Sequence, residues 1–211
     1  MLNKDSLLDL EFISFMLFYI FILYTNEWFA INTQNMEKNQ KPLYDRGHEL
    51  LTPKISSKIP DYLLTALIIY FLIRWFLTYK PVLTNYFFLI SILFIMRIFV
   101  FMGTETPTPM QKCHGKSKWK DIKWWFGEDD KTCIDNMFSG HTAHATGIFL
   151  FTLLFSTYLS EKIATFFIMI MIMITLIWSR MHYTSDVVVG FLLTVGYFFA
   201  AFKVEKILKL S

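Results

Sequence analysis

The sequence predicts an all-α, polytopic membrane helical bundle with six transmembrane helices, and three observations carry that prediction. Hydrophobic residues make up 55% of the 211 residues, more than the roughly 45–50% of a soluble domain. Charged residues are only 18%, below the usual value of about 25%, and they cluster. Six apolar stretches approach the roughly 20 residues that a helix needs to cross the hydrocarbon core. This composition excludes a disordered chain, a coiled coil and a disulfide-dense secreted module.

The predicted spans lie near residues 12–31, 61–80, 83–102, 143–160, 163–179 and 187–203. The first span is the weakest, because Glu27 lies inside it. Arg74 and Arg97 lie close to the ends of the second and third spans, where long side chains can extend to the headgroups. None of these stretches alternates in the way that a membrane strand does, so the sequence predicts helices throughout.

Two long loops, near 32–60 and 103–142, separate the spans, and the sequence predicts short turns at two other places. One turn is expected around Pro81 and the other around Ser160, Glu161 and Lys162. The N-terminal region lacks the short apolar segment and cleavage site of a removed signal peptide, so the first span is expected to serve as a retained signal-anchor. We expect residues 1–211 to form a single integral membrane domain.

The charge balance indicates the membrane, rather than nucleic acid, as the partner. There are 20 basic and 17 acidic residues, too even a balance for a nucleic-acid-binding protein. Most basic residues lie in the two long loops and near the 180–186 turn. Taken alone, the positive-inside rule would place those loops in the cytoplasm. The sequence makes no prediction of the oligomeric state.

Two segments concentrate polar residues at the ends of apolar spans, where such residues are functional candidates. His141 opens the fourth span and His182 follows the fifth. Because the two spans form an antiparallel hairpin, both imidazoles are expected on the same membrane face. His182 and Asp186 are four residues apart and would be neighbours on a helix. The carboxylate would orient His182 as a nucleophile or base, and His141 could protonate a leaving alkoxide.

Other residues in these segments suit a phosphate group. Ser139 and Gly140 at a helix start offer backbone N–H groups, and Arg97 and Arg180 could supply charged hydrogen bonds. No ligand cluster indicates a metal, and no cofactor is predicted. Simpler alternatives remain open: a structural histidine near a helix end, an ordinary helix pair of His182 and Asp186, and Ser139 as an N-cap.

These segments resemble the two signature motifs of the sphingomyelin synthases, a branch of the type 2 phosphatidic acid phosphatase superfamily. The first motif is matched by Asp135, Phe138, Ser139, Gly140, His141 and Thr142, and the second by His182, Tyr183, Thr184, Asp186 and Val187. The segment after the family's third span is matched by Arg97, Thr104, Pro107, Pro109 and Cys113. Residues 41–45 resemble a segment of the family's first long loop more weakly. The motif-bearing core covers about residues 97–200.

The resemblance implies six spans, cytosolic termini, and an active site on the lumenal or outer face of the Golgi, endoplasmic reticulum or plasma membrane. His182 would attack the phosphorus, Asp186 would orient it, and His141 would exchange protons with the two alcohols. The implied donor is phosphatidylcholine or phosphatidylethanolamine, the acceptor is ceramide and the product is diacylglycerol. Asp135 and Tyr183 join Arg97, Ser139, Gly140 and Arg180 as expected substrate-binding residues.

Some features depart from the family or leave alternatives open. The chain has no Arg-Pro dipeptide, and Met181 stands where the animal synthases have an acidic residue. The headgroup is therefore open, as is a lipid phosphate phosphatase that uses water as acceptor, or a non-catalytic lipid-binding protein. Cys113 and Cys133 either pair or remain thiols. His144 either lines a lipid cavity or packs in a helix, and His48 is expected to be an ordinary loop residue.

Overall fold

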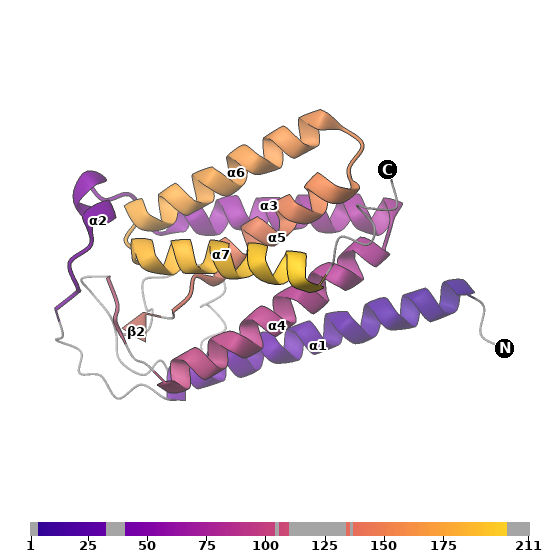
Figure 1. The fold of residues 1–211 in the computed structure, drawn as a ribbon, viewed down its shortest axis with the longest axis horizontal. Helices are drawn as coiled ribbons and strands as arrows, with labels where there is room; N and C mark the ends of the chain where they lie inside the picture. The colour runs from indigo at the N-terminus through magenta and orange to yellow at the C-terminus, as the bar shows by residue number, and fades with distance from the viewer. Residues whose placement is uncertain (1–3, 33–40, 104–105, 110–133, 136, 202–211) are drawn as a thin grey trace.

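A computed structural model describes residues 4–32, 41–103, 106–109, 134–135 and 137–201, and these residues form seven helices and two short strands (Figure 1). The elements in chain order are α1 (Lys4–Asn32), α2 (Arg46–Leu50), α3 (Lys58–Thr78), α4 (Pro81–Gly103), β1 (Thr106–Pro107), β2 (Ile134–Asp135), α5 (Gly140–Phe155), α6 (Leu159–Trp178) and α7 (Thr184–Ala201). The strands pair antiparallel, with Thr106 opposite Asp135. Neither α2 nor this pairing was predicted, because each is too short to leave a periodic pattern.

Five of the described helices are long and apolar enough to cross a membrane: α1, α3, α4, α6 and α7. The prediction of an all-helical chain with several membrane-spanning helices is therefore confirmed. The remaining predicted span, the fourth one near 143–160, corresponds to α5, which has only 16 residues and would be about 24 Å long at 1.5 Å per residue. The count of six spans thus remains a prediction.

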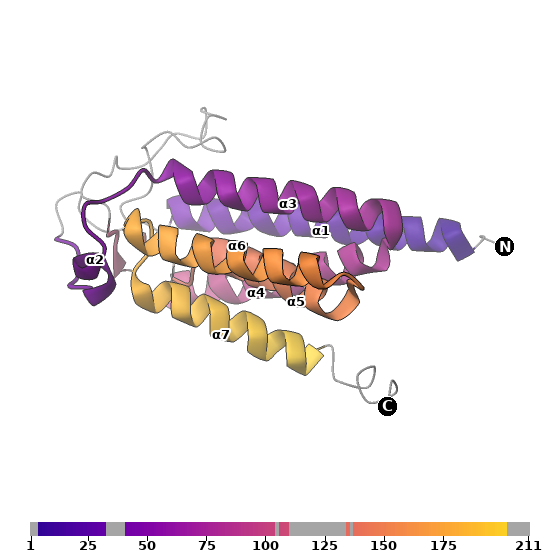
Figure 2. The same cartoon turned by 90° about the horizontal axis from the view of Figure 1, so that it is seen from above.

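Helix α5 is the central element of the bundle. It packs against α3, α4, α6 and α7, whereas α1 packs along α4 (Figures 1 and 2). Ala143, Ile148 and Phe151 on α5 are fully buried. At Gly147 an added Cβ would lie 3.4 Å from Ile90 and 3.5 Å from Tyr86, in ordinary van der Waals contact, so α4 packs directly against α5 there. A helix enclosed on several sides by other helices can carry polar groups that lipid would not tolerate.

The predicted turn at Pro81 is confirmed, but the predicted turn at Ser160, Glu161 and Lys162 is wrong. Helix α4 begins at Pro81, a position that needs no N–H donor. Helix α5 ends at Phe155, and the chain turns before α6 begins at Leu159. Ser156 donates a hydrogen bond to the Glu161 carboxylate. That contact places Glu161 in the first turn of α6 rather than in the connection.

The two arginines near span ends bind polar groups of neighbouring helices, and their expected extension to the headgroups remains a prediction. The Arg74 Nε donates to Oε1 of Glu161 at 2.9 Å, which ties α3 to α6. Arg97 is buried, and its Nη1 donates to Oδ1 of Asn26 at 3.2 Å. Asn26 in turn donates to the Phe94 carbonyl at 2.8 Å. Both guanidinium groups therefore join helices within the bundle.

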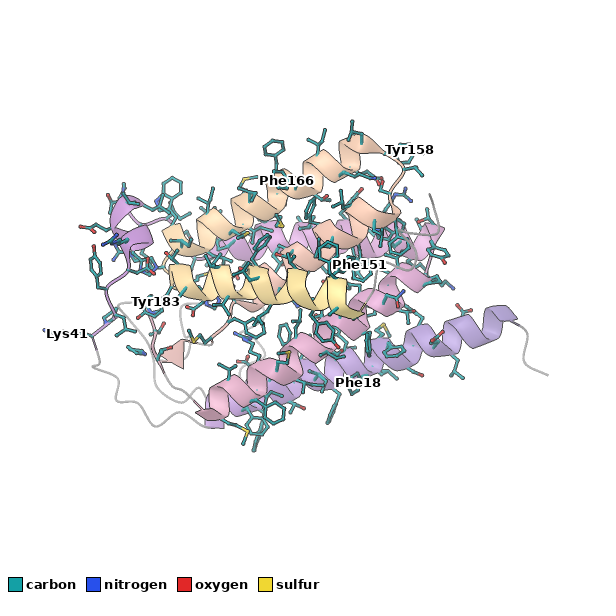
Figure 3. The ribbon with its side chains drawn as sticks, viewed as in Figure 1. Phe18, Lys41, Phe151, Tyr158, Phe166 and Tyr183 are labelled. Carbon is teal, nitrogen blue, oxygen red and sulfur yellow. The ribbon has the colours of Figure 1, made fainter. Side chains whose placement is uncertain are left out.

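One end of the bundle gathers His48, His141 and His182, and we call it the histidine end. Helices α3, α5 and α7 begin there, α6 ends there, and α2 lies against it (Figures 1 and 2). With side chains drawn, Lys41 and Tyr183 lie at this end and Tyr158 lies at the opposite one (Figure 3). The two long loops thus contribute ordered elements to the same end as the two histidine motifs.

Candidate active site

The N-terminus of α5 presents His141 as the second residue of the helix. Ser139 is the N-cap, and its hydroxyl accepts a hydrogen bond from the Thr142 N–H at 3.3 Å. Gly140 is buried, and a Cβ added there would lie 3.4 Å from the Arg97 guanidinium. The capping alternative for Ser139 is therefore confirmed. Ser139 and Gly140 are at a helix start, as predicted, and Arg97 lies close to Gly140, whereas binding of phosphate by these residues remains a prediction.

His141 has a carboxylate partner that the sequence did not reveal. Its Nε2–H donates to Oδ1 of Asp61, in the first turn of α3, at 2.7 Å. The His141 and Asp61 side chains are 26% and 25% exposed, so the pair borders the bundle surface. A carboxylate in this position fixes the ring orientation and the tautomer and stabilises the imidazolium. His141 is thereby suited to donate and accept a proton.

His182 lies in the turn between α6 and α7 and faces His141. The centroids of the two imidazole rings are 6.2 Å apart, close enough for one phosphoryl group to contact both. His182 is 6% exposed, so the protein shields it more than His141. The predicted meeting of the two histidines at one end of the bundle is therefore what the structure shows.

Asp186 is in the first turn of α7 and is almost completely buried, at 1% exposure. Its Oδ2 accepts a hydrogen bond from the Tyr183 N–H at 2.9 Å. The expectation that His182 and Asp186 share a helix is wrong, because α7 begins at Thr184 and His182 lies in the turn before it. The Asp186 carboxylate instead closes the short turn that carries His182, and its predicted role in orienting His182 remains a prediction.

A backbone hydrogen bond joins the two motifs directly. The Ser139 N–H donates to the Asp186 carbonyl at 3.1 Å. At Gly190, one turn further along α7, an added Cβ would lie 2.9 Å from the Ser139 carbonyl oxygen. A glycine is needed there for α7 to approach the start of α5. The relative positions of His141 and His182 depend on this contact.

Residues 41–51, which we call the strap, pack across the 182–184 turn. The Nε2–H of His48 donates to the His182 carbonyl at 2.9 Å, and His48 is 8% exposed. The expectation that His48 is an ordinary loop residue is therefore wrong. Gly47 allows this approach, since a Cβ there would lie 2.2 Å from the Thr184 hydroxyl.

Asp45 is the main anchor of the strap. Its Oδ2 accepts from the Thr184 N–H at 2.7 Å, and its Oδ1 accepts from the Thr184 hydroxyl at 2.7 Å and from the His48 N–H at 3.1 Å. Burial by itself would raise the pKa of the Asp45 carboxyl, but these hydrogen bonds outweigh burial and hold the pKa below its ordinary value. Residues 41–45, which weakly resemble a family segment, thus belong to a part of the chain that contacts the second histidine motif.

Tyr183, expected to bind substrate, has its hydroxyl engaged by two backbone groups. The Tyr183 hydroxyl donates to the Pro107 carbonyl at 2.8 Å and accepts from the Leu43 N–H at 2.9 Å. Tyr183 therefore links the strap, β1 and the second motif. A substrate-binding role for Tyr183 is still a prediction, whereas its contacts within the protein are clear.

Arg180 ends α6 with a backbone conformation that is unusual for its residue type. Its φ is 56°, in the left-handed region where a non-glycine residue costs about 1–2 kcal/mol. The Arg180 and Met181 N–H groups donate to the carbonyls of Ile177 and Leu176 at 3.0 and 3.1 Å, closing the helix at a position where glycine is usual. Binding of phosphate by Arg180 remains a prediction.

Other predicted residues contribute less to the site. The backbone of Asp135 belongs to β2, but its side chain lies outside what the structure describes, as do Cys113 and Cys133. The Tyr86 and Tyr19 hydroxyls lie 2.7 and 3.3 Å from Nδ1 and Nε2 of His144. The packed alternative for His144 is therefore the observed one. Within the described ranges, no three His, Cys, Asp or Glu side chains form a group that could hold a metal.

Comparison with known proteins agrees with the geometry. Residues 132–203 match the family described as PAP2 superfamily C-terminal, a region that includes both histidine motifs and helices α5 to α7. The chain matches none of the curated proteins with which it was compared. This part of the chain is therefore similar to the type 2 phosphatidic acid phosphatase superfamily, whose members are phosphatases and phosphotransferases.

Proposed function

We propose that this protein is a membrane phosphotransferase that moves phosphocholine or phosphoethanolamine from a glycerophospholipid to ceramide. The observation that supports this most is the facing pair of imidazoles, 6.2 Å apart between ring centroids, at one end of an apolar bundle. His141 is hydrogen bonded to the Asp61 carboxylate, and the buried Asp186 carboxylate accepts the Tyr183 N–H in the turn that carries His182. Because the surroundings of the two imidazoles differ, one imidazole can act as the nucleophile and the other as the proton donor.

In the first half-reaction, a ring nitrogen of His182 attacks the phosphorus of the donor lipid. An N–P bond forms, the P–O bond to diacylglycerol breaks, and His141 gives a proton to the departing oxygen. In the second half-reaction, His141 takes the proton of the ceramide primary hydroxyl, whose oxygen attacks the phosphorus as the N–P bond breaks. Each half-reaction forms one bond and breaks another. Because the two half-reactions follow one another through a covalent intermediate, the mechanism predicts ping-pong kinetics.

Positive groups near the N-terminus of α5 would stabilise the negative charge on phosphorus. The Arg97 guanidinium lies near Gly140, where the N-terminal end of a helix also favours anions. Arg97 is buried at 9% exposure, and a guanidinium interacts more strongly with phosphate when water is excluded. We therefore expect Arg97 to stabilise the phosphate from a position that the bundle shields from water.

The main alternative is a lipid phosphatase, in which water replaces ceramide in the second half-reaction. The low exposure of His182 favours the transferase, because a shielded phosphohistidine hydrolyses less readily than an exposed one. The same residues would act in both cases, and only the acceptor would differ. The proposed orientation places the histidine end on the lumenal or outer face of the membrane.

A headgroup-transfer assay tests this function. Purified protein is placed in liposomes that contain ceramide and headgroup-labelled phosphatidylcholine or phosphatidylethanolamine, and products are identified by mass spectrometry. We expect labelled sphingomyelin or ceramide phosphoethanolamine with the wild-type protein and neither product with His182→Ala. Release of free phosphocholine or phosphoethanolamine without transfer would support the phosphatase. No turnover of any donor would support the non-catalytic lipid-binding alternative.

A further inference from the structure

A cavity of about 320 Å³ lies between the strap and the turn that follows α6. Its lining residues come from these two segments and from the end of the β1 segment: Pro42, Leu43, Tyr44, Asp45, His48, Glu49, Pro109 and Arg180. A volume near the lower limit of the roughly 300–1,000 Å³ of small-molecule sites suits a headgroup rather than a whole lipid. The cavity lies at the end of the bundle where Lys41 and Tyr183 are seen in Figure 3.

Arg180 gives one side of this cavity a positive charge. Its Nε is buried and has no hydrogen-bond partner among the described residues. Glycine would close α6 at this position without strain, yet the position holds an arginine with φ 56°. A strained residue whose side chain lines a cavity is more readily explained by the use of that side chain than by packing. A guanidinium with hydrogen-bonding capacity to spare suits a phosphate group.

Glu49 and Tyr44 give the other side a negative charge and an aromatic ring. The Tyr44 hydroxyl donates to Oε2 of Glu49 at 2.5 Å, which holds the two side chains together. Asp45, by contrast, is occupied by its three hydrogen bonds to Thr184 and His48. A carboxylate next to an aromatic ring attracts an ammonium group through both its charge and the ring face. Glu49 is therefore the carboxylate suited to a cationic ligand.

We propose that this cavity is the headgroup subsite and that it takes a zwitterionic phosphoalkylammonium group. Arg180 would contact the phosphate, and Glu49 and Tyr44 would contact the ammonium. The cavity adjoins the turn that carries His182. Arg180, which lines the cavity, is two residues before His182, and His48, which also lines it, donates a hydrogen bond to the His182 carbonyl. This inference rests on the proposed function. It predicts that the site prefers donor lipids with an amine headgroup to phosphatidic acid.

Binding of free headgroups to the purified full-length chain tests the subsite without catalysis. The probes are phosphocholine, phosphoethanolamine and inorganic phosphate, with thermal unfolding in detergent as the readout. We expect the two zwitterions to bind the wild-type protein more tightly than phosphate does. Glu49→Gln should weaken zwitterion binding about tenfold and leave phosphate binding unchanged. Glu11→Gln removes an exposed carboxylate on α1 and should behave as the wild type.

Two variants of Arg180 separate binding from folding. Arg180→Gly should raise the ligand-free unfolding midpoint by about 2–4 °C, because it removes the left-handed strain, and should weaken binding of all three probes. Arg180→Gln keeps a long side chain without the charge and should weaken all three probes as well. The proposal is overturned if Glu49→Gln keeps the wild-type preference for zwitterions, or if both Arg180 variants bind the probes as the wild type does.

The transfer assay, run in parallel, distinguishes failure of this subsite from failure of the proposed function. Transfer by the wild-type protein together with unchanged zwitterion binding in Glu49→Gln would reject the subsite alone. Headgroup binding that depends on Glu49 and Arg180, without transfer or hydrolysis, would support the subsite and reject the proposed reaction.

Discussion

The Nε2 atom of His141 lies 2.7 Å from Oδ1 of Asp61, although the two residues are 80 positions apart in the chain. This contact joins the start of α5 to the start of α3 and gives the first histidine motif its own carboxylate. Together with Asp186, whose carboxylate closes the turn that carries His182, it gives each of the two histidine motifs an acidic residue. The candidate site therefore draws on α3 as well as on the region that matches the superfamily.

Asp61→Asn is expected to lower turnover by about a hundredfold, because the uncharged amide stabilises the His141 imidazolium less than the carboxylate does. Headgroup transfer in liposomes measures this effect. Asp9→Asn is the matched control, since Asp9 forms an exposed ion pair with Lys80 on the opposite side of the bundle from the histidine end. Equal turnover of Asp61→Asn and the wild type would remove Asp61 from the mechanism.

His48→Ala is expected to lower kcat more than it raises KM, because the His182 carbonyl loses the hydrogen bond that holds the turn in place. His48→Gln should recover much of the loss, since the glutamine amide can place an N–H donor near the position of the imidazole Nε2–H. Steady-state kinetics of both variants tests this positioning role. An equal loss in His48→Gln and His48→Ala would indicate that packing of the ring, rather than the hydrogen bond, matters.

Gly190→Ala is expected to destabilise the protein by about 1–3 kcal/mol and to lower activity. The added Cβ would lie 2.9 Å from the Ser139 carbonyl oxygen and would force α7 away from the start of α5. Gly196 is the matched control on the same helix, because a Cβ there meets nothing within 4 Å. Gly196→Ala should keep activity and gain helix propensity. Thermal unfolding and the transfer assay compare the two variants, and similar behaviour would contradict the close contact.

Acid is expected to release the strap through protonation of Asp45. The pKa of this carboxyl is held below its ordinary value of 3.8, so its stabilising contribution is complete above that value. The contribution is lost as the pH falls through the lowered pKa of the folded state. Hydrogen exchange of residues 41–51 at a series of acid pH values measures the release, and Asp45→Asn should remove its dependence on pH. Exchange that is independent of acid in the wild type would contradict this account.

Hydropathy was sufficient to predict the long helices, since five of them satisfy the length and apolarity of a membrane span. The predicted turn between α5 and α6 lies too late in the chain, because Ser160, Glu161 and Lys162 are more polar than the actual connection but belong to the first turns of α6, where Glu161 accepts a hydrogen bond from Ser156. The strand pairing and α2 lie in polar loops, where short elements are set by tertiary contacts rather than by a periodic pattern.

The two histidine motifs were found in the sequence because each is a local pattern, and the hairpin of α5 and α6 brings them together. Asp61 and His48 were missed for the opposite reason. Their partners are 80 and 134 positions away in the chain, and nothing in the surrounding sequence distinguishes an acidic residue at a helix start or a loop histidine. The weak resemblance of residues 41–45 to a family segment was the one feature of the sequence that indicated a role for the strap.

Identification of the covalent intermediate tests the central claim most directly. Protein is mixed with the active headgroup-labelled donor without acceptor, quenched in base to preserve a phosphorus–nitrogen bond, digested and analysed by mass spectrometry. The account predicts a phosphocholine or phosphoethanolamine adduct on His182 in the wild type and neither adduct nor transfer in His182→Ala. An adduct on His141 instead, or normal transfer by His182→Ala, would contradict it.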